Sequence, residues 1–226
     1  MSSQIEKRIS EWRDRISEAS VKWGAPEICA VTKTIEPERI NEVLNCGIHT
    51  IGENRVQELL GKVDGLNKGF EIHMIGHLQS NKAKSIIGVT STIQSLDSLP
   101  LAEEISRRSV AAGLVTKVLV QINIGREKQK SGIPEELLHT FLNEVSGLPG
   151  IHIEGLMSIM PFVQDPEDIR TLFRRMRTLF DRFREEPVEN VDMHVLSMGM
   201  SDDCIVAAQE GATMVRLGRA IFGERL

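Results

Sequence analysis

The chain of 226 residues is 41% hydrophobic and 26% charged, with a formal net charge of -5 at pH 7. This length and apolar content suit a single α/β barrel domain over residues 1–226, since such barrels typically run to about 250 residues. The acidic balance argues against a nucleic-acid partner, and the chain lacks the roughly 18 consecutive apolar residues of a membrane span.

An amphipathic helix is predicted at the start of the chain. Its apolar residues recur at helical spacing and form one stripe: Ile5, Ile9, Trp12 and Ile16. Ser3 and Glu6 stand at the spacing of a capping box, in which each side chain satisfies a backbone amide of the first turn. We expect this extra N-terminal helix to precede the first strand and to lie as a lid on the bottom of a barrel.

The first short apolar run, residues 27–33, ends in Lys33. A lysine at the end of a buried strand loses hydration, which lowers its pKa and makes its amine a nucleophile for aldehydes. On spacing alone, a salt-bridged lysine at a strand end is the alternative. A helix is predicted next, because Pro37 stands at a first-turn position and Gly47 follows the apolar residues.

The same cycle of apolar run, turn and helical pattern repeats along the chain. Further strands are predicted over residues 48–52, 71–76, 89–95, 117–123, 151–159, 191–198 and 213–218. Strands separated by helices pair in parallel through right-handed crossovers, and about eight such units close into a (β/α)8 TIM-type barrel. An open doubly wound sheet is the alternative, although no G-x-G-x-x-G turn follows the first strand.

The clearest helical pattern follows Asp165 and Pro166, which form a capped start. A wide apolar face comes next: Ile169, Leu172, Phe173, Met176, Phe180 and Phe183. The segment also carries arginines: Arg170, Arg174, Arg175, Arg177, Arg182 and Arg184. Because Asp181, Glu185 and Glu186 are interleaved with them, we expect a solvated helix face rather than a contact with a phosphate backbone.

The carboxyl ends of the strands should converge, because they all open on one face of a parallel barrel. They carry the polar residues Lys33, Glu53, Asn54, His73, His77, Asp97, Asn123, Ser158, Ser197, Ser201, Arg216 and Arg219, together with Met157. Lys117 begins its strand and is expected on the opposite, structural face. The spacing of the two histidines lacks the glutamate of an H-E-x-x-H motif, so no metal site is predicted.

Two loops, after the seventh and eighth predicted strands, have the composition of a barrel's phosphate site. Residues 197–201 offer the Gly199 turn with the hydroxyls of Ser197 and Ser201, and residues 218–221 offer a second glycine turn, backbone amides and an arginine. Two aspartates at positions 202 and 203 would repel an anion, so an ordinary capped helix is the alternative.

An imine-forming lysine and a phosphate cradle on one face indicate a phosphorylated aldehyde or ketone, and pyridoxal 5'-phosphate (PLP) fits that description. Arg216, on an alternating strand, can then enter the site and donate a hydrogen bond to the pyridine nitrogen. Arginine cannot protonate that nitrogen, so it weakens the ring as an electron sink. Taken alone, Arg216 is better explained as an ion-pair partner.

The three cysteines, Cys29, Cys46 and Cys204, are scattered without C-x-x-C spacing, which fits a reducing compartment. The first residues carry no apolar secretory core, so we expect a cytoplasmic protein. No histidine partner for Cys204 is identifiable in the sequence, which favours a packed thiol over a nucleophile.

The chain resembles the pyridoxal phosphate homeostasis proteins over essentially its whole length. The segments that carry the resemblance are residues 30–33, 52–54, 73–82, 130–132, 155–157, 197–202 and 215–218. The resemblance implies a barrel like the N-terminal domain of alanine racemase, with PLP held as a Schiff base on Lys33. It also implies that Arg216 faces the pyridine nitrogen and that Asn54 and Met157 lie near the ring.

The phosphate, by the same resemblance, is held by Ser201 and by the amides around Gly199, Gly218 and Arg219. Family members often have a small hydroxyl residue where this chain has Arg219, which bears on the role of its side chain but not of its amide. The implied function is a carrier in PLP (vitamin B6) and amino-acid homeostasis without established catalysis. PLP-dependent apoenzymes are its expected acceptors.

The composition bears on catalysis, because two-base racemisation of the alanine racemase type uses a tyrosine from a second domain. This chain has no tyrosine. The alternatives are a weak PLP-dependent racemase or transaminase, and a sugar-phosphate lyase that uses the lysine without a cofactor. We find no spare apolar stripe and expect a monomer.

Overall fold

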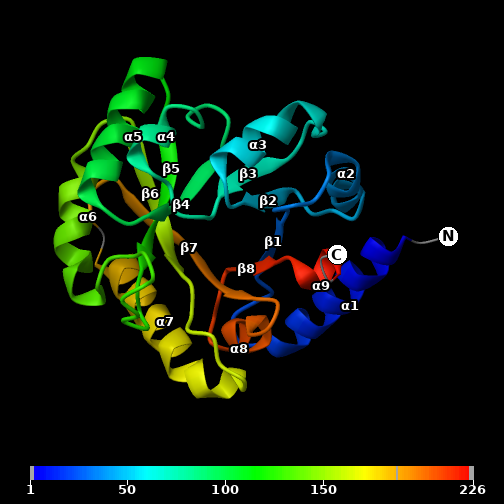
Figure 1. The fold of residues 1–226 in the computed structure, drawn as a ribbon. Helices are drawn as coiled ribbons and strands as arrows, with labels where there is room; N and C mark the ends of the chain where they lie inside the picture. Colours follow the sequence, from blue (N-terminus) through cyan, green and yellow to red (C-terminus); the bar gives the residue numbers. More distant parts are fainter. Residues whose placement is uncertain (1–2, 187, 224–226) are drawn as a thin grey trace.

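A closed barrel of parallel strands forms the centre of the protein (Figure 1). The computed structural model describes residues 3–186 and 188–223. The strands are β1 (Glu27–Val31), β2 (Thr50–Glu53), β3 (Glu71–Met74), β4 (Thr92–Leu96), β5 (Thr116–Ile122), β6 (Ile151–Ser158), β7 (Val191–Met200) and β8 (Met214–Leu217). β8 pairs with β1 and places Met214 opposite Glu27, so the sheet closes on itself. This confirms the (β/α)8 barrel and excludes the open sheet.

Helices surround the barrel. One precedes the first strand, and the others follow the strands in turn. The helices are α1 (Gln4–Ala19), α2 (Pro37–Asn45), α3 (Val56–Lys62), α4 (Ser80–Ala83), α5 (Leu99–Ala112), α6 (Leu138–Ser146), α7 (Arg170–Glu185), α8 (Cys204–Gln209) and α9 (Arg219–Phe222), with the 3-10 helices η1 (Val63–Gly65), η2 (Glu135–Leu137) and η3 (Pro166–Ile169). In the part of the chain described, no helix combines the length and apolar character needed to cross a membrane.

The predicted strand positions are confirmed within a few residues. The largest difference is at β4, which begins at Thr92 instead of residue 89. Before it the chain makes a tight turn, in which the amide of Thr90 donates to the carbonyl of Ile86 at 2.9 Å. That amide is therefore committed to the turn and not to the ladder with β3.

The N-terminal helix α1 forms as predicted, but the expected lid across the bottom of the barrel is wrong. Ser3 caps the helix by accepting a hydrogen bond from the Glu6 amide at 3.1 Å. The helix then packs along the side of the barrel against α2, α8 and α9 (Figure 1). Because α9 spans only one turn after β8, α1 takes the place in the outer layer beside the β8–β1 seam, where its apolar stripe is buried.

Helix α7 buries the predicted apolar face, including Phe173 and Phe180. One of its arginines departs from the expected solvated face. Arg177 is 8% exposed, donates to the carbonyl of Gly211 at 3.0 Å and lies over the Trp23 ring at 4.2 Å. It is buried because α7 meets the turn before β8 at this point. The aliphatic part of the arginine side chain packs there, while its guanidinium donates to the backbone of the turn.

Candidate functional site

A cavity of about 230 Å³ opens at the carboxyl ends of β1, β7 and β8. The residues that line it are Val31, Lys33, Met200, Ser201, Asp202, Arg216, Gly218 and Arg219. Lys33 thus shares one cavity with residues far away in the sequence, as the convergence of strand ends in a parallel barrel requires. The structure brings together Lys33, Arg216 and the two predicted loops.

A constrained turn carries Lys33, which is half-buried and lies two residues after the end of β1. Thr34 has a φ of 63°, in the left-handed region that non-glycine residues seldom occupy. The Thr34 amide donates to the Glu58 carboxylate, and Lys62 Nζ donates to the carbonyls of Thr32 at 3.0 Å and Ile35 at 3.2 Å. Contacts from α3 therefore hold the turn in a conformation that is unfavourable on its own.

Lys62 is the centre of a buried charged cluster below this turn. Its ammonium lies 3.0 Å from Glu53 Oε1 and 2.8 Å from Glu58 Oε1, and its side chain is 9% exposed. Burial raises the pKa of Glu53, opposed by its hydrogen bond from Thr32 and by Lys62. Burial acts in the same direction on Glu58, but hydrogen bonds from Lys62 and the Thr34 amide lower the pKa of Glu58 overall.

The sequence alone does not predict the part that Lys62 and Glu58 play in this cluster. One local signal was present, because Glu58 and Lys62 stand four residues apart and lie on one face of a helix. That spacing usually indicates an exposed pair. Nothing in it shows that the pair lies against the turn that carries Lys33.

Arg216 enters the barrel from β8, as predicted. The side chain is 3% exposed, its Nη1 donates to Ser197 O at 2.9 Å and Ser197 Oγ at 2.6 Å, and its Nη2 donates to Ser158 O at 2.8 Å. Burial lowers the pKa of Arg216, while the neighbouring Cys29 and Asp203 favour its charged form. Arginine stays protonated in proteins, so a buried guanidinium borders the cavity beneath Lys33.

Ser197 lies within β7, as the predicted strand over residues 191–198 has it, and the strand continues past it to Met200. Its side chain is fully buried and contacts Arg216 and Gln94. We therefore correct its expected place in the phosphate cradle to a place inside the barrel. Gly199 does not end the strand, so the predicted phosphate loop begins after Met200 instead of at Ser197.

The loops after β7 and β8 meet where the phosphate cradle is predicted. Ser201 Oγ accepts a hydrogen bond from the amide of Ala220 at 3.3 Å. Gly199 has a φ of +92°, and a Cβ at this position would lie 2.5 Å from Ala207 Cβ of α8. Only glycine allows α8 to approach β7 so closely.

The two aspartates of this region are each engaged by a neighbour. Asp202 forms an ion pair with Arg219, and both side chains are about half exposed. Asp203 Oδ1 accepts from the Met200 amide at 2.5 Å, and burial raises the pKa of this carboxyl group. The charge of Arg219 is therefore shared with Asp202, while its backbone lies at the start of α9 on the cavity wall.

Asn54 and Met157 are not among the residues that line the 230 Å³ cavity. Met157 is fully buried in β6, between Gln121 of β5 and Ser197 of β7. Asn54 directly follows β2, and its carbonyl oxygen would lie 2.3 Å from a Cβ placed on Gly76. Their contacts with a ring stay predictions.

His73 does not join this face, contrary to the expectation from its place in the strand. It lines a cavity of about 460 Å³ at the amino ends of the strands, together with Glu71 and Lys117. The His73 side chain is buried and contacts Gln94 of β4, so it belongs to the interior of the barrel and not to the face that carries Lys33. The prediction that Lys117 lies on the opposite face is confirmed. His77 Nδ1 instead lies 3.0 Å from Asp97 Oδ2.

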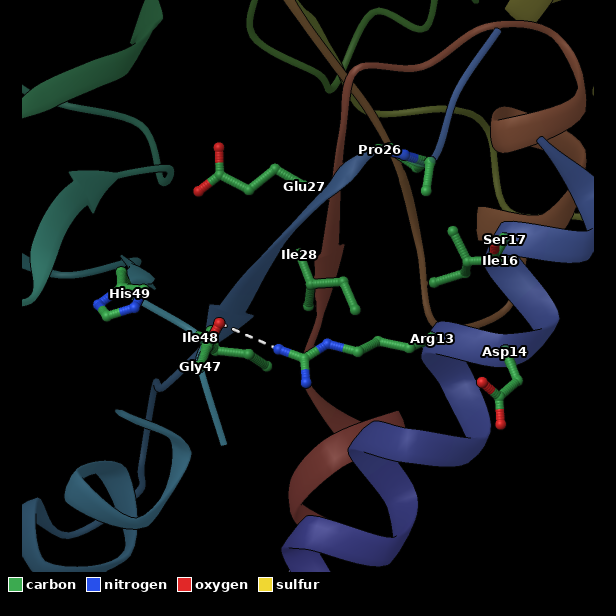
Figure 2. A pocket seen from close by; sticks show the side chains of 11 residues that line it. Arg13, Asp14, Ile16, Ser17, Pro26, Glu27, Ile28, Gly47, Ile48 and His49 are labelled. Atoms are coloured by element: carbon green, nitrogen blue, oxygen red, sulfur yellow. Dashed lines mark hydrogen bonds between the residues drawn. The ribbon is translucent and has the colours of Figure 1, made fainter. Parts of the chain in front are cut away.

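A larger crevice of about 590 Å³ lies between α1 and the starts of β1 and β2. Figure 2 shows Arg13 reaching from α1 across this crevice to the carbonyl of Gly47, at 3.0 Å. Ile16 of α1 and Ile28 of β1 both line it (Figure 2). Neither Lys33 nor Arg216 lines it, so the site is not the largest hollow of the molecule.

Cys204 begins α8 and is fully buried, and burial raises the pKa of its thiol to about 12. A thiol with so high a pKa is a poor nucleophile, in agreement with the predicted packed thiol. The three cysteines, Cys29, Cys46 and Cys204, are all free.

A parallel barrel with an extra N-terminal helix, whose cavity joins a lysine after β1 to loops after β7 and β8, defines the alanine racemase type of barrel. A family model described as "Alanine racemase, N-terminal domain" matches residues 4–226. A pyridoxal phosphate homeostasis protein of Aquifex aeolicus (strain VF5) is 43% identical over 224 residues, with 97% of each chain covered. The chain belongs to the alanine racemase N-terminal domain family and, within it, to the pyridoxal phosphate homeostasis proteins.

Further similarities agree with this assignment. The pyridoxal phosphate homeostasis protein of Escherichia coli (strain K12) is 35% identical over 231 residues, covering 99% of this chain and 97% of the relative. The structure of PipY from Synechococcus elongatus PCC7942 with PLP bound has a TM-score of 0.85 at 31% identity, covering 97% of this chain and 100% of that chain. Alanine racemase of Clostridium difficile 630, at 16% identity and a TM-score of 0.71, shares the fold alone.

Proposed function

We propose that this protein binds PLP as a Schiff base on Lys33 and serves in PLP (vitamin B6) and amino-acid homeostasis without catalytic turnover. One observation carries the proposal: Lys33, Arg216, Ser201 and Gly218 line a single cavity. The PLP bound to PipY and the names of the curated relatives support it.

The residues present fit such a cofactor. The cavity offers an amine for the aldehyde of PLP and a buried guanidinium for its pyridine nitrogen. Two loops, with a hydroxyl and glycine turns, suit its phosphate. When bound, PLP supplies a reactive aldehyde and a ring that can accept electrons. We propose that Ser201 and the amides around Gly199, Gly218 and Arg219 hold the phosphate, and that Asn54 and Met157 lie near the ring.

Arg216 supports a protein that holds PLP rather than one that uses it to turn over a substrate. A guanidinium can donate to the pyridine nitrogen but cannot protonate it, and an unprotonated ring is a poor electron sink. The chain has no tyrosine, so the second base of two-base racemisation cannot come from that residue type. A weak PLP-dependent racemase or transaminase is the second candidate, favoured by the family model alone.

The cysteines bear on the cellular compartment of the protein. Three free cysteines suit a reducing compartment, which supports a cytoplasmic protein. Its partners are then PLP itself and the PLP-dependent apoenzymes that receive it. We propose a monomer, since the apolar stripe of α1 is already buried against its own barrel.

The visible absorbance of the purified protein tests the proposal. We expect a band that disappears in Lys33→Ala and persists in the control Lys7→Ala, because Lys7 is exposed on α1. After borohydride reduction, mass analysis should place the cofactor on Lys33. A colourless protein that gains no band with added PLP would contradict the proposal, and rapid exchange of an amino acid's α-proton with solvent deuterium would favour the racemase candidate.

A further inference from the structure

Buried side chains form a hydrogen-bonded row through the barrel below the cavity, which we name the interior row (Arg216, Ser197, Gln94 and His73). Arg216 Nη1 donates to Ser197 Oγ at 2.6 Å, and Ser197 Oγ donates to Gln94 Oε1 at 2.7 Å. Gln94 Nε2 lies 2.8 Å from His73 Nδ1. All these side chains are at most 5% exposed, so water does not compete for the contacts.

The chemistry of its members sets the direction of the row. Arginine can only donate, so the Ser197 oxygen accepts a hydrogen bond from Arg216, and the Ser197 hydroxyl donates its own hydrogen bond to Gln94 Oε1. The Gln94 amide nitrogen then faces His73 and can only donate. His73 Nδ1 must therefore be an acceptor, which leaves the proton of the neutral ring on Nε2.

The charges at the two ends agree with this direction. The guanidinium stands at one end, and at the other the mostly exposed Glu71 carboxylate stands 4.0 Å from His73 Nε2, which is too far for a hydrogen bond. Every donor in between points away from the cation and towards the carboxylate, an alignment in which each hydrogen bond strengthens the next. Burial, assisted by the positive charge of Lys117, lowers the pKa of His73 to about 4, so its ring is neutral and able to accept at pH 7.

We propose that Gln94, with His73 behind it, is a positioning residue for Arg216 and thereby for the pyridine nitrogen of PLP. This inference rests on the proposed function. The hydrogen bond from the Ser197 hydroxyl to Gln94 fixes the direction of the O–H group. With the O–H group in this direction, the lone pairs of the oxygen face Arg216. Without that acceptor the hydroxyl is free to rotate, and the guanidinium is then held only by its contacts with the carbonyls of Ser197 and Ser158. A fully buried glutamine in a barrel strand otherwise has no packing advantage over leucine.

The first test uses the protein without cofactor. Nitrogen-15 NMR of the histidine rings should show His73 as the Nε2–H tautomer, and the guanidinium of Arg216 should exchange its protons slowly. Finding the Nδ1–H tautomer would overturn the direction of the row, whether or not any variant folds.

The second test compares two ligands of the protein. PLP offers a ring nitrogen to Arg216, whereas 1-deaza-PLP, in which carbon replaces that nitrogen, cannot accept a hydrogen bond there. In Gln94→Leu we expect a roughly ten-fold loss of affinity for PLP, the size of one hydrogen bond, and little change for 1-deaza-PLP. Gln121→Leu is the matched control, because Gln121 is also a buried strand glutamine but donates to the Ser131 carbonyl at 3.0 Å, outside the row.

His73 supplies a conservative variant for the same comparison. His73→Asn keeps an acceptor for Gln94 and should retain the preference for PLP over 1-deaza-PLP, whereas His73→Leu should reduce it. If Gln94→Leu loses affinity equally for PLP and 1-deaza-PLP, or keeps the wild-type preference for PLP, the interior row has only a structural role. A wild-type protein that binds neither ligand would instead refute the proposed function.

Discussion

Lys62 donates to the main-chain carbonyl of Thr32 at 3.0 Å, across 30 residues of sequence. The contact fixes the residue directly before Lys33 from a neighbouring helix. The amine proposed to carry PLP is thus oriented by a second lysine, which remains inside a cluster of carboxylates and is not itself at the cavity wall.

Lys62→Met should destabilise the protein and weaken PLP binding together. The substitution leaves Glu53 buried without its counter-ion, and removal of one partner from a buried pair costs about 3–5 kcal/mol. Urea unfolding and PLP titration measure the two effects. Arg107→Met is the control, because its ion pair with Glu104 is mostly exposed and should contribute little. A Lys62→Met protein with wild-type stability and affinity would refute the positioning of the turn.

His73 should make stability depend on pH. Its ordinary pKa of 6.5 falls to about 4 in the folded state, so the unfolded chain binds a proton that the folded chain refuses between these values. Stability is therefore full above pH 6.5 and is lost as the pH falls towards 4, by roughly 2–3 kcal/mol at pH 4.5.

His73 lines the cavity of about 460 Å³ at the amino ends of the strands. The other ionisable groups around this cavity are Glu27, Glu71, Lys117, Glu154 and His194. All five are present in both wild type and His73→Asn, so the difference between the two proteins isolates His73. Urea unfolding at pH 7 and pH 4.5 should show a smaller loss in the variant. If both proteins lose the same stability, His73 is not buried in its neutral form.

Gly199 and Gly218 should respond differently to alanine. Gly199→Ala places a methyl group 2.5 Å from Ala207 Cβ at a φ of +92°, so we expect a loss of about 1–3 kcal/mol. Gly218→Ala meets Val31 Cβ at 3.4 Å, an ordinary contact, so stability should change little. Any loss of affinity for PLP relative to pyridoxal in Gly218→Ala would then report on the phosphate itself. Thermal unfolding and titration with both ligands would show whether the two glycines differ in this way.

Asp202 should oppose the binding of an anion. Asp202→Asn removes a negative charge from the cavity wall and releases Arg219 from its ion pair, so affinity for PLP should rise a few-fold at low salt and less at high salt. Stability should hardly change, because exposed ion pairs contribute little. Titrations at two salt concentrations measure the effect, and an affinity that falls in Asp202→Asn would show that the carboxylate helps to shape the loop.

Strand ends and helix positions were readable from the sequence because they depend on local patterns. The alternation of apolar runs with helical stripes predicted all of β1 to β8, and Lys33, Arg216 and Ser201 were placed on one face by parallel topology alone. The hydroxyl of Ser197 is inside the barrel and not in the predicted phosphate loop, because β7 passes through Gly199 to Met200. The place of α1 could not be predicted, because it depends on the shortness of α9 at the other end of the chain.

By itself the sequence determined the barrel, the lysine at its first strand end and the loops at its last two, since periodicity and turn residues act within short windows. The tertiary structure alone decided which polar groups meet inside the barrel: Lys62 with the turn at Thr32, and Arg216 with His73 through Ser197 and Gln94. These contacts join residues on separate strands and helices. Their hydrogen bonds depend on the closure and register of the sheet, which no local pattern encodes.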